Sequence, residues 1–108
     1  MKRIVFLIAG VVMGASGAWA QAPAKTVSLY KSHCAMCHGD DGTSNTPAGK
    51  ALGALAYGAP AVKKASDAQL EEAIAKGKGQ MPPFGSQLSA AQIKSLVAYV
   101  RELGAKQK

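Results

Sequence analysis

Apolar residues near the C-terminus recur at the spacing of one helical face. That spacing predicts a helix with a single buried side. A capping box, Ser89-Ala90-Ala91-Gln92, precedes the stripe, and Leu88 and Ile93 occupy the positions of a hydrophobic staple. We predict that this helix begins after Ser89 and ends at Gly104. The stripe consists of Ile93, Leu96, Val97, Val100 and Leu103.

A second helix is predicted by the same device further upstream. Ser66-Asp67-Ala68-Gln69 is another capping box, and Glu72 can pair with Lys76 one helical turn later. Gly77 is the natural stop at the C-terminal end. The inner face of this helix consists of Leu70, Ala73 and Ile74.

The rest of the chain carries weaker helical patterns and no alternating pattern typical of strands. A helix is predicted over Thr26–Cys37 and a short one over Gly49–Ala56. Residues 39–47 and 58–60 are rich in Gly, Asp, Ser, Asn and Pro, which favours turns. The predicted fold class is therefore all-α.

The N-terminus has the composition of a secretory signal peptide. Met1-Lys2-Arg3 is a short basic start, Ile4–Ala15 is apolar and uncharged, and Ala18-Trp19-Ala20 is a small-x-small cleavage site. The apolar run is shorter than the roughly 20 residues that span a bilayer, and no cysteine at the cleavage site offers a lipid anchor. We expect residues 1–20 to be removed. Residues 21–108 then form one exported, periplasmic domain, a monomer without stable membrane insertion.

The net charge of residues 21–108 is positive and bears on the partners of the domain. Lys2 and Arg3 leave with the signal peptide, so 11 of the 13 basic residues face 6 acidic ones, a formal charge of +5. No basic run is interleaved with aromatic residues, which argues against nucleic acid as a partner. The excess charge favours redox partners with acidic docking surfaces, and ordinary solvated lysines explain it equally well.

The segment Cys34-Ala35-Met36-Cys37-His38 carries the clearest chemistry. It spells C-x-x-C-H, the attachment motif of a c-type haem. Two thiols about one helical turn apart can reach the two vinyl groups on one edge of a porphyrin and form thioethers. The residue after the second cysteine then lies under the ring, where its imidazole can bind the iron. We predict one covalent haem c, held by Cys34 and Cys37, with His38 as an axial ligand.

Other interpretations of this segment are weaker. A redox dithiol usually lies in a strand-helix-strand context, which is missing here. A structural zinc site draws ligand pairs from separated segments, and the chain has no further Cys or His. A plain disulfide leaves His38 unexplained. His33 directly precedes Cys34, and we expect it to be exposed and not to bind the iron.

The second chemical motif is Lys78-Gly79-Gln80-Met81-Pro82-Pro83-Phe84. Met81 and Met36 are the only methionines after the signal peptide, and Met36 is confined between the two cysteines. Two prolines stiffen the loop at Met81, so little entropy is left to lose when its thioether binds a metal. We therefore predict Met81 as the second axial ligand, because Met/His ligation is a standard haem arrangement. A core methionine packing near Phe84 is the alternative.

With both motifs in hand, the chain resembles the class I c-type cytochromes, which are small soluble monohaem proteins. The resemblance rests on Cys34–Gly39, on Gly79–Phe84 and on the C-terminal helix with Tyr99 and Arg101. It implies a cytochrome c fold of about four short helices around one haem. It also implies that the N- and C-terminal helices cross. Leu29 and Tyr30 are then expected to meet Leu96, Val97 and Val100.

The resemblance carries two further expectations. It implies a proline whose carbonyl accepts the Nδ1–H of the axial histidine, and Pro47 is the candidate. Many members place a tryptophan near a haem propionate, and this chain has none after Trp19. Tyr57, Gln80 or a lysine would serve instead, and the sequence does not choose among them.

The predicted function is one-electron transport between periplasmic or membrane redox partners, not an enzymatic reaction. Axial ligands from His38 and Met81 leave no open position for oxygen, peroxide or substrate. The iron would then cycle between Fe(II) and Fe(III) with little rearrangement. Two alternatives stay open. One is a haem peroxidase or gas sensor with a labile sixth position, and the other is a fixed cytochrome subunit of a larger dehydrogenase or oxidase.

Overall fold

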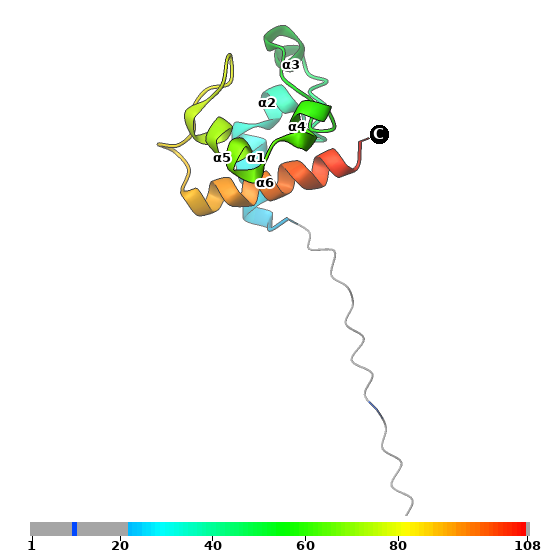
Figure 1. Ribbon diagram of the computed structural model, residues 1–108, viewed down its shortest axis with the longest axis vertical. Coiled ribbons are helices and arrows are strands. Elements are labelled where there is room, and N and C mark those ends of the chain that lie inside the picture. The colour runs from blue at the N-terminus through cyan, green and yellow to red at the C-terminus, as the bar shows by residue number, and fades with distance from the viewer. Residues whose placement is uncertain (1–9, 11–21, 108) are drawn as a thin grey trace, which may run out of the picture.

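The computed structural model describes Gly10 and residues 22–107. This described part folds into six helices and contains no strand, which confirms the predicted all-α class (Figure 1). The predicted signal peptide, residues 1–20, lies outside the described residues except for Gly10. None of the described helices is both long and apolar enough to span a bilayer. The helices are α1 (Ala24–His33), α2 (Ala35–His38), α3 (Pro47–Leu52), α4 (Pro60–Lys64), α5 (Asp67–Lys76) and α6 (Ala90–Ala105).

Both predicted capping boxes are formed. The Ser66 side chain accepts a hydrogen bond from the Gln69 backbone N–H, and the Gln69 side chain accepts one from the Ser66 N–H. Ser89 and Gln92 make the same reciprocal pair at the start of α6. Each box satisfies two backbone donors that a bare helix start would leave unpaired.

The predicted helix over Thr26–Cys37 is wrong in its continuity. The chain is helical from Ala24, leaves the regular helix at Cys34, where φ is −118°, and resumes as the single-turn α2. The Cys34 N–H still donates to the Tyr30 carbonyl, and the Cys34 carbonyl accepts from the His38 N–H at 3.0 Å. Cys34 therefore lies at the break and Cys37 in the single turn after it, rather than both on one straight helix.

The core forms where α1 packs against α6, as the crossing of the terminal helices implies (Figure 1). Tyr30 of α1 and Leu96 of α6 are both fully buried, and burying a side chain such as Leu96 contributes about 1.5–3 kcal/mol. The Tyr30 ring meets the edges of Tyr57 and Tyr99 at centroid distances of 6.2 and 5.0 Å. In both figures α2, α3 and the loop after α5 lie on the same side of α6, so the motif segments gather there.

Gly104 does not end α6, contrary to the prediction. The helix continues to Ala105, and Gly104 is buried within it. A Cβ at this position would lie 2.7 Å from the carbonyl oxygen of Tyr57. This glycine therefore allows the backbone of the Tyr57 segment to approach α6 closely.

The two middle helices also differ from prediction. The short helix expected over Gly49–Ala56 is α3, which begins two residues earlier, because the Thr46 side chain caps it and Pro47 takes its first position, and which ends four residues earlier, at Leu52. The prediction missed α4, where Pro60 at the first position was the available signal. Arg101 of α6 holds α4 in place, since its guanidinium donates to the carbonyls of Val62 and Ala65.

Candidate haem site

Cys34 and Cys37 lie at the junction of α1 and α2, and both are free thiols that are partly buried. Burial, reinforced by the neighbouring Cys37, raises the pKa of the Cys34 thiol to about 11. Cys34 also packs against the core cluster that contains Tyr30 and Leu96. The break at Cys34 thus places one thiol toward the core while α2 carries the other.

His38 ends α2, and its ring is held by a hydrogen bond. Its Nδ1 atom lies 3.1 Å from the carbonyl oxygen of Leu55. A carbonyl can only accept, so Nδ1 carries the hydrogen and Nε2 of the neutral ring keeps its lone pair. The Ser44 hydroxyl donates to the same carbonyl at 2.9 Å and lies 3.4 Å from Nδ1. Burial lowers the pKa of His38, and the hydrogen bond to Leu55 raises it by less. The net lowering of the pKa favours the neutral ring.

The structure gives this contact to Leu55 and not to Pro47, the residue expected from the resemblance. Pro47 occupies the first position of α3, where the carbonyl points along the helix and serves its internal hydrogen bonds. Leu55 follows the end of α3, and its carbonyl is free of such a bond. The acceptor for the imidazole therefore comes from the segment that follows α3, and not from the start of α3.

Tyr57 braces the other side of the imidazole. Its ring stacks on His38 with a centroid distance of 4.8 Å and an interplanar angle of 26°. Gly42, at φ +73°, lets this ring lie close, because a Cβ there would come within 2.4 Å of it. Burial and the neighbouring Tyr30 hydroxyl raise the pKa of Tyr57 well above its usual range, so the ring stays neutral.

The Met81 loop, defined as residues 77–84, is closed on itself. Lys78 and Met81 exchange two backbone hydrogen bonds of 3.1 and 3.0 Å around a turn in which Gly79 has a positive φ. Beyond Pro82 and Pro83, the Phe84 N–H donates to the carbonyl of Ile74 at 2.9 Å. The first part of the loop is thereby closed by the pairing of Lys78 with Met81, and its last residue, Phe84, is bonded to α5.

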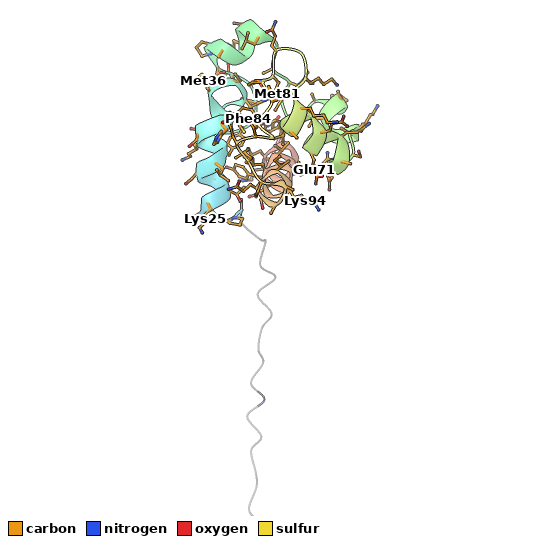
Figure 2. The ribbon with its side chains drawn as sticks, turned by 90° about the vertical axis from the view of Figure 1, so that its left-hand side faces the viewer. Lys25, Met36, Glu71, Met81, Phe84 and Lys94 are labelled. Carbon is orange, nitrogen blue, oxygen red and sulfur yellow. The ribbon has the colours of Figure 1, made fainter. Side chains whose placement is uncertain are left out.

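The two methionines have different surroundings. Met81 is partly buried and packs against the core cluster, whereas Met36 is 79% exposed. In Figure 2, Met81 and Phe84 lie between the ribbons of α1 and α5 in this view, and Met36 lies at the outer side of α2. This contrast agrees with the interpretation of Met36 as a spacer between the cysteines.

A family model described as "Cytochrome C oxidase, cbb3-type, subunit III" matches residues 21–100, most of the chain. The chain belongs to this family and is a class I c-type cytochrome. The CcoP subunit of a cbb3-type oxidase from Azospirillum sp. is 38% identical over 88 residues, which cover 75% of this chain and 28% of that protein. The FixP subunit from Azorhizobium caulinodans is 35% identical, covering 84% and 30%. The cytochrome therefore spans less than a third of these oxidase subunits.

Other relatives match the cytochrome along most of their own length. Cytochrome c6 from Picosynechococcus sp. is 32% identical over 112 residues, covering 94% of both proteins. Among solved structures, the KustC0563 c-type cytochrome is 36% identical with a TM-score of 0.66, covering 72% of this chain and 95% of that one. The cytochrome c fold is thereby confirmed.

Cytochromes of this class carry covalently bound haem c, and the residues present in this cytochrome fit that group. Two free thiols lie three residues apart, and the Nε2 atom of His38 has no hydrogen-bond partner among the described residues. The side chain of Leu55, next to the imidazole through its carbonyl, is 54% exposed and suits an apolar macrocycle. No group of three or more His, Cys, Asp or Glu side chains that could hold a metal ion occurs in the part of the cytochrome that the structure describes.

Sequence reasoning missed three features around these groups: Ser44, Leu55, and Tyr57 as a partner of His38. The only sequence signal for Ser44 is its place in the turn-rich segment 39–47, which indicates a turn but not a contact with the Leu55 carbonyl. Leu55 acts through its backbone, so its side chain gives no hint. His33 is partly buried and not exposed as predicted, because it contacts Phe84 of the Met81 loop.

Proposed function

We propose that this cytochrome is a one-electron carrier whose haem c is attached through Cys34 and Cys37 and ligated by His38 and Met81. The observation that carries the proposal is the hydrogen bond from His38 Nδ1 to the Leu55 carbonyl. It fixes the tautomer that leaves Nε2 available to a metal, as second-shell partners of ligating histidines commonly do.

The chain's own residues have separate tasks in this proposal. Cys34 and Cys37 anchor the group covalently, so it cannot dissociate between donor and acceptor. Leu55 and Tyr57 orient the imidazole, and the Lys78–Met81 bridge with Pro82 and Pro83 holds the thioether. When bound, the haem supplies the Fe(II)/Fe(III) couple, and a sulfur ligand raises its potential relative to a second nitrogen ligand.

We propose docking to acidic redox partners through lysines next to the motif segments. Lys50 on α3 and Lys78 in the Met81 loop are exposed. The charge of Lys76 contributes less to such docking, because its ammonium lies 3.4 Å from the carboxylate of Glu72, which offsets it. Surface lysines of this kind steer encounter more than they add affinity.

We further propose export to the periplasm, with residues 1–20 as a cleaved signal peptide. The basic start, the apolar run and the Ala18-Trp19-Ala20 site carry this proposal. Mass spectrometry of the exported protein tests it, since an N-terminus at Gln21 is expected. An exported protein that still contains residues 1–20 would contradict the proposed cleavage.

A second candidate function is that of an electron-transfer subunit attached to an oxidase. It is favoured by the family match and by the CcoP and FixP relatives. The similarity to cytochrome c6 along 94% of its length favours the free carrier. Fractionation of native cells separates the two candidates: a free carrier is recovered from the periplasmic extract as a monomer, whereas a subunit stays with the oxidase in the membrane after mild detergent extraction.

Spectroscopy of the purified holoprotein tests the proposed ligands. The oxidised protein is expected to show a Met-sulfur-to-iron charge-transfer band and to be low-spin. Met81→Ala is expected to abolish this band, lower the midpoint potential and open the iron to carbon monoxide. Met36→Leu is the matched control and is expected to change none of these. If the wild type and Met81→Ala bind carbon monoxide equally well, the carrier proposal is wrong and the peroxidase or gas-sensing alternative takes its place.

A further inference from the structure

His33 connects the first helix to the Met81 loop. Its imidazole and the ring of Phe84 meet edge to face, with centroids 5.7 Å apart and an interplanar angle of 89°. The two residues are 51 positions apart in the sequence and belong to the segments that carry the two motifs. His33 directly precedes Cys34, and Phe84 is three residues after Met81.

The His33 ring is fixed from its own helix. Its Nδ1 lies 2.9 Å from the carbonyl oxygen of Leu29, one turn earlier in α1. Since that carbonyl can only accept, Nδ1–H is the donor, and the imidazole keeps one orientation. A ring fixed in this way presents a stable surface to Phe84.

Phe84 is fixed from the other direction. Its N–H donates to Ile74 at the end of α5, and its carbonyl accepts from the N–H of Leu88 at 2.9 Å. Pro82 and Pro83 have fixed φ angles, so fewer free backbone rotations separate Phe84 from Met81 than in an ordinary loop. The contact with His33 therefore links α1 to the loop that carries Met81.

We propose that His33 is a positioning residue that latches the Met81 loop closed through Phe84. This inference rests on the proposed role of Met81 as a ligand. An edge-to-face aromatic pair contributes about 0.5–1.5 kcal/mol beyond its burial. Loss of the latch is therefore expected to favour displacement of Met81 by about two- to tenfold.

The probe is imidazole, added to the oxidised holoprotein and followed through loss of the Met-sulfur charge-transfer band. His33→Ala and Phe84→Ala are each expected to strengthen imidazole binding by about fivefold. The double variant is expected to bind imidazole no more strongly than either single variant, because both substitutions remove the same contact. His33→Phe keeps an aromatic ring and is expected to restore most of the wild-type behaviour. Lys31→Ala, an exposed change in the same helical turn, is the matched control.

A second readout does not depend on the iron. Hydrogen exchange of the Phe84 and Gly85 amides, which donate to Ile74 and Ala75, is expected to accelerate about fivefold in His33→Ala. Exchange of the Leu96 amide within α6 is expected to stay unchanged, which excludes a global loss of stability.

The outcomes separate the two proposals. If the wild-type protein lacks the charge-transfer band, Met81 is not the ligand and the proposed function fails. If the band is present but His33→Ala leaves imidazole binding and exchange unchanged, the latch is wrong and the carrier proposal stands. If the single effects multiply in the double variant, the two residues act independently and the latch is also overturned.

Discussion

The hydroxyl of Tyr30 donates a buried hydrogen bond of 2.6 Å to the carbonyl oxygen of Gly39. Tyr30 is the fully buried residue of α1, and Gly39 directly follows His38. Burial of the phenol raises the pKa of Tyr30 to about 12, so it remains a donor throughout the physiological range. The bond ties the segment that ends in the imidazole to the helical core.

Tyr30→Phe is expected to destabilise the protein by about 0.5–1.5 kcal/mol, because the buried Gly39 carbonyl loses one of its two donors and keeps only the Gly42 N–H. Denaturant unfolding of the holoprotein measures the change. Tyr99→Phe is the control, since the Tyr99 hydroxyl makes no hydrogen bond within the described residues and its loss is expected to cost little. Equal losses in the two variants would show that the Gly39 bond has no special weight.

Gly104→Ala is expected to destabilise the protein by about 1–3 kcal/mol, although alanine is the better helix former. The added Cβ would meet the Tyr57 carbonyl at 2.7 Å and push that segment away from α6. Thermal and denaturant unfolding check this, with Lys94→Ala on the exposed face of α6 as the comparison. A stabilised Gly104→Ala variant would mean that the contact relaxes easily.

Arg101→Lys is expected to lower stability by about 1–2 kcal/mol, because an ammonium cannot reproduce the fork that reaches two carbonyls at once. The Asp67 carboxylate, 3.1 Å from the guanidinium, is 71% exposed, so that ion pair contributes little. Asp67→Asn is therefore expected to cost clearly less than Arg101→Lys in the same unfolding assay. A larger cost for Asp67→Asn would make the ion pair, not the carbonyl contacts, the source of the stability.

The pKa of Asp41 is lowered by hydrogen bonds from the Thr43 side chain and backbone N–H. A depressed carboxyl pKa adds stability above the unfolded value, about 3.9, and this stability is lost as pH falls through the folded value. Thr43→Val removes the hydroxyl donor and is expected to raise the Asp41 pKa toward its ordinary value. An NMR titration of Asp41 measures this shift, and an unchanged pKa would rule out the hydroxyl as its main cause.

Electron transfer to an acidic physiological partner is expected to slow as salt rises, because screening shortens the reach of charge steering. Stopped-flow rates at low and physiological ionic strength test this. Lys78→Gln is expected to weaken the salt dependence more than Lys76→Gln, because Lys76 is paired with Glu72. A rate that stays flat or rises with salt would remove the acidic docking surface from the proposal.

Local signals predicted the starts of α5 and α6 and the all-α fold class correctly. The capping boxes at Ser66 and Ser89 depend on residues three positions apart, so a single sequence contains all that is needed. The family resemblance then supplied the packing of α1 on α6. The break at Cys34 went unpredicted, because Ala35, Met36 and Cys37 have no helix-breaking chemistry.

The details of the candidate site could not be read from the sequence for a different reason. The partner of His38 is a backbone carbonyl, and every residue carries one, so the choice of Leu55 over Pro47 is made by the path of the chain after α3. Gly104 was interpreted as a helix stop because its role depends on Tyr57, 47 residues earlier. The pairing of His33 with Phe84 likewise exists only after the helices have packed.

The stacking of Tyr57 on His38 has a consequence for the order of assembly. The cysteine motif leaves the ribosome early, but the tyrosine that braces its imidazole is seated against Gly104, near the end of the chain. Until those last residues are synthesised and docked, the motif has its thiols and its imidazole but not the imidazole's final orientation. Truncations that remove the end of α6 are therefore expected to impair haem attachment as well as the core, although they lie more than 60 residues from the cysteines.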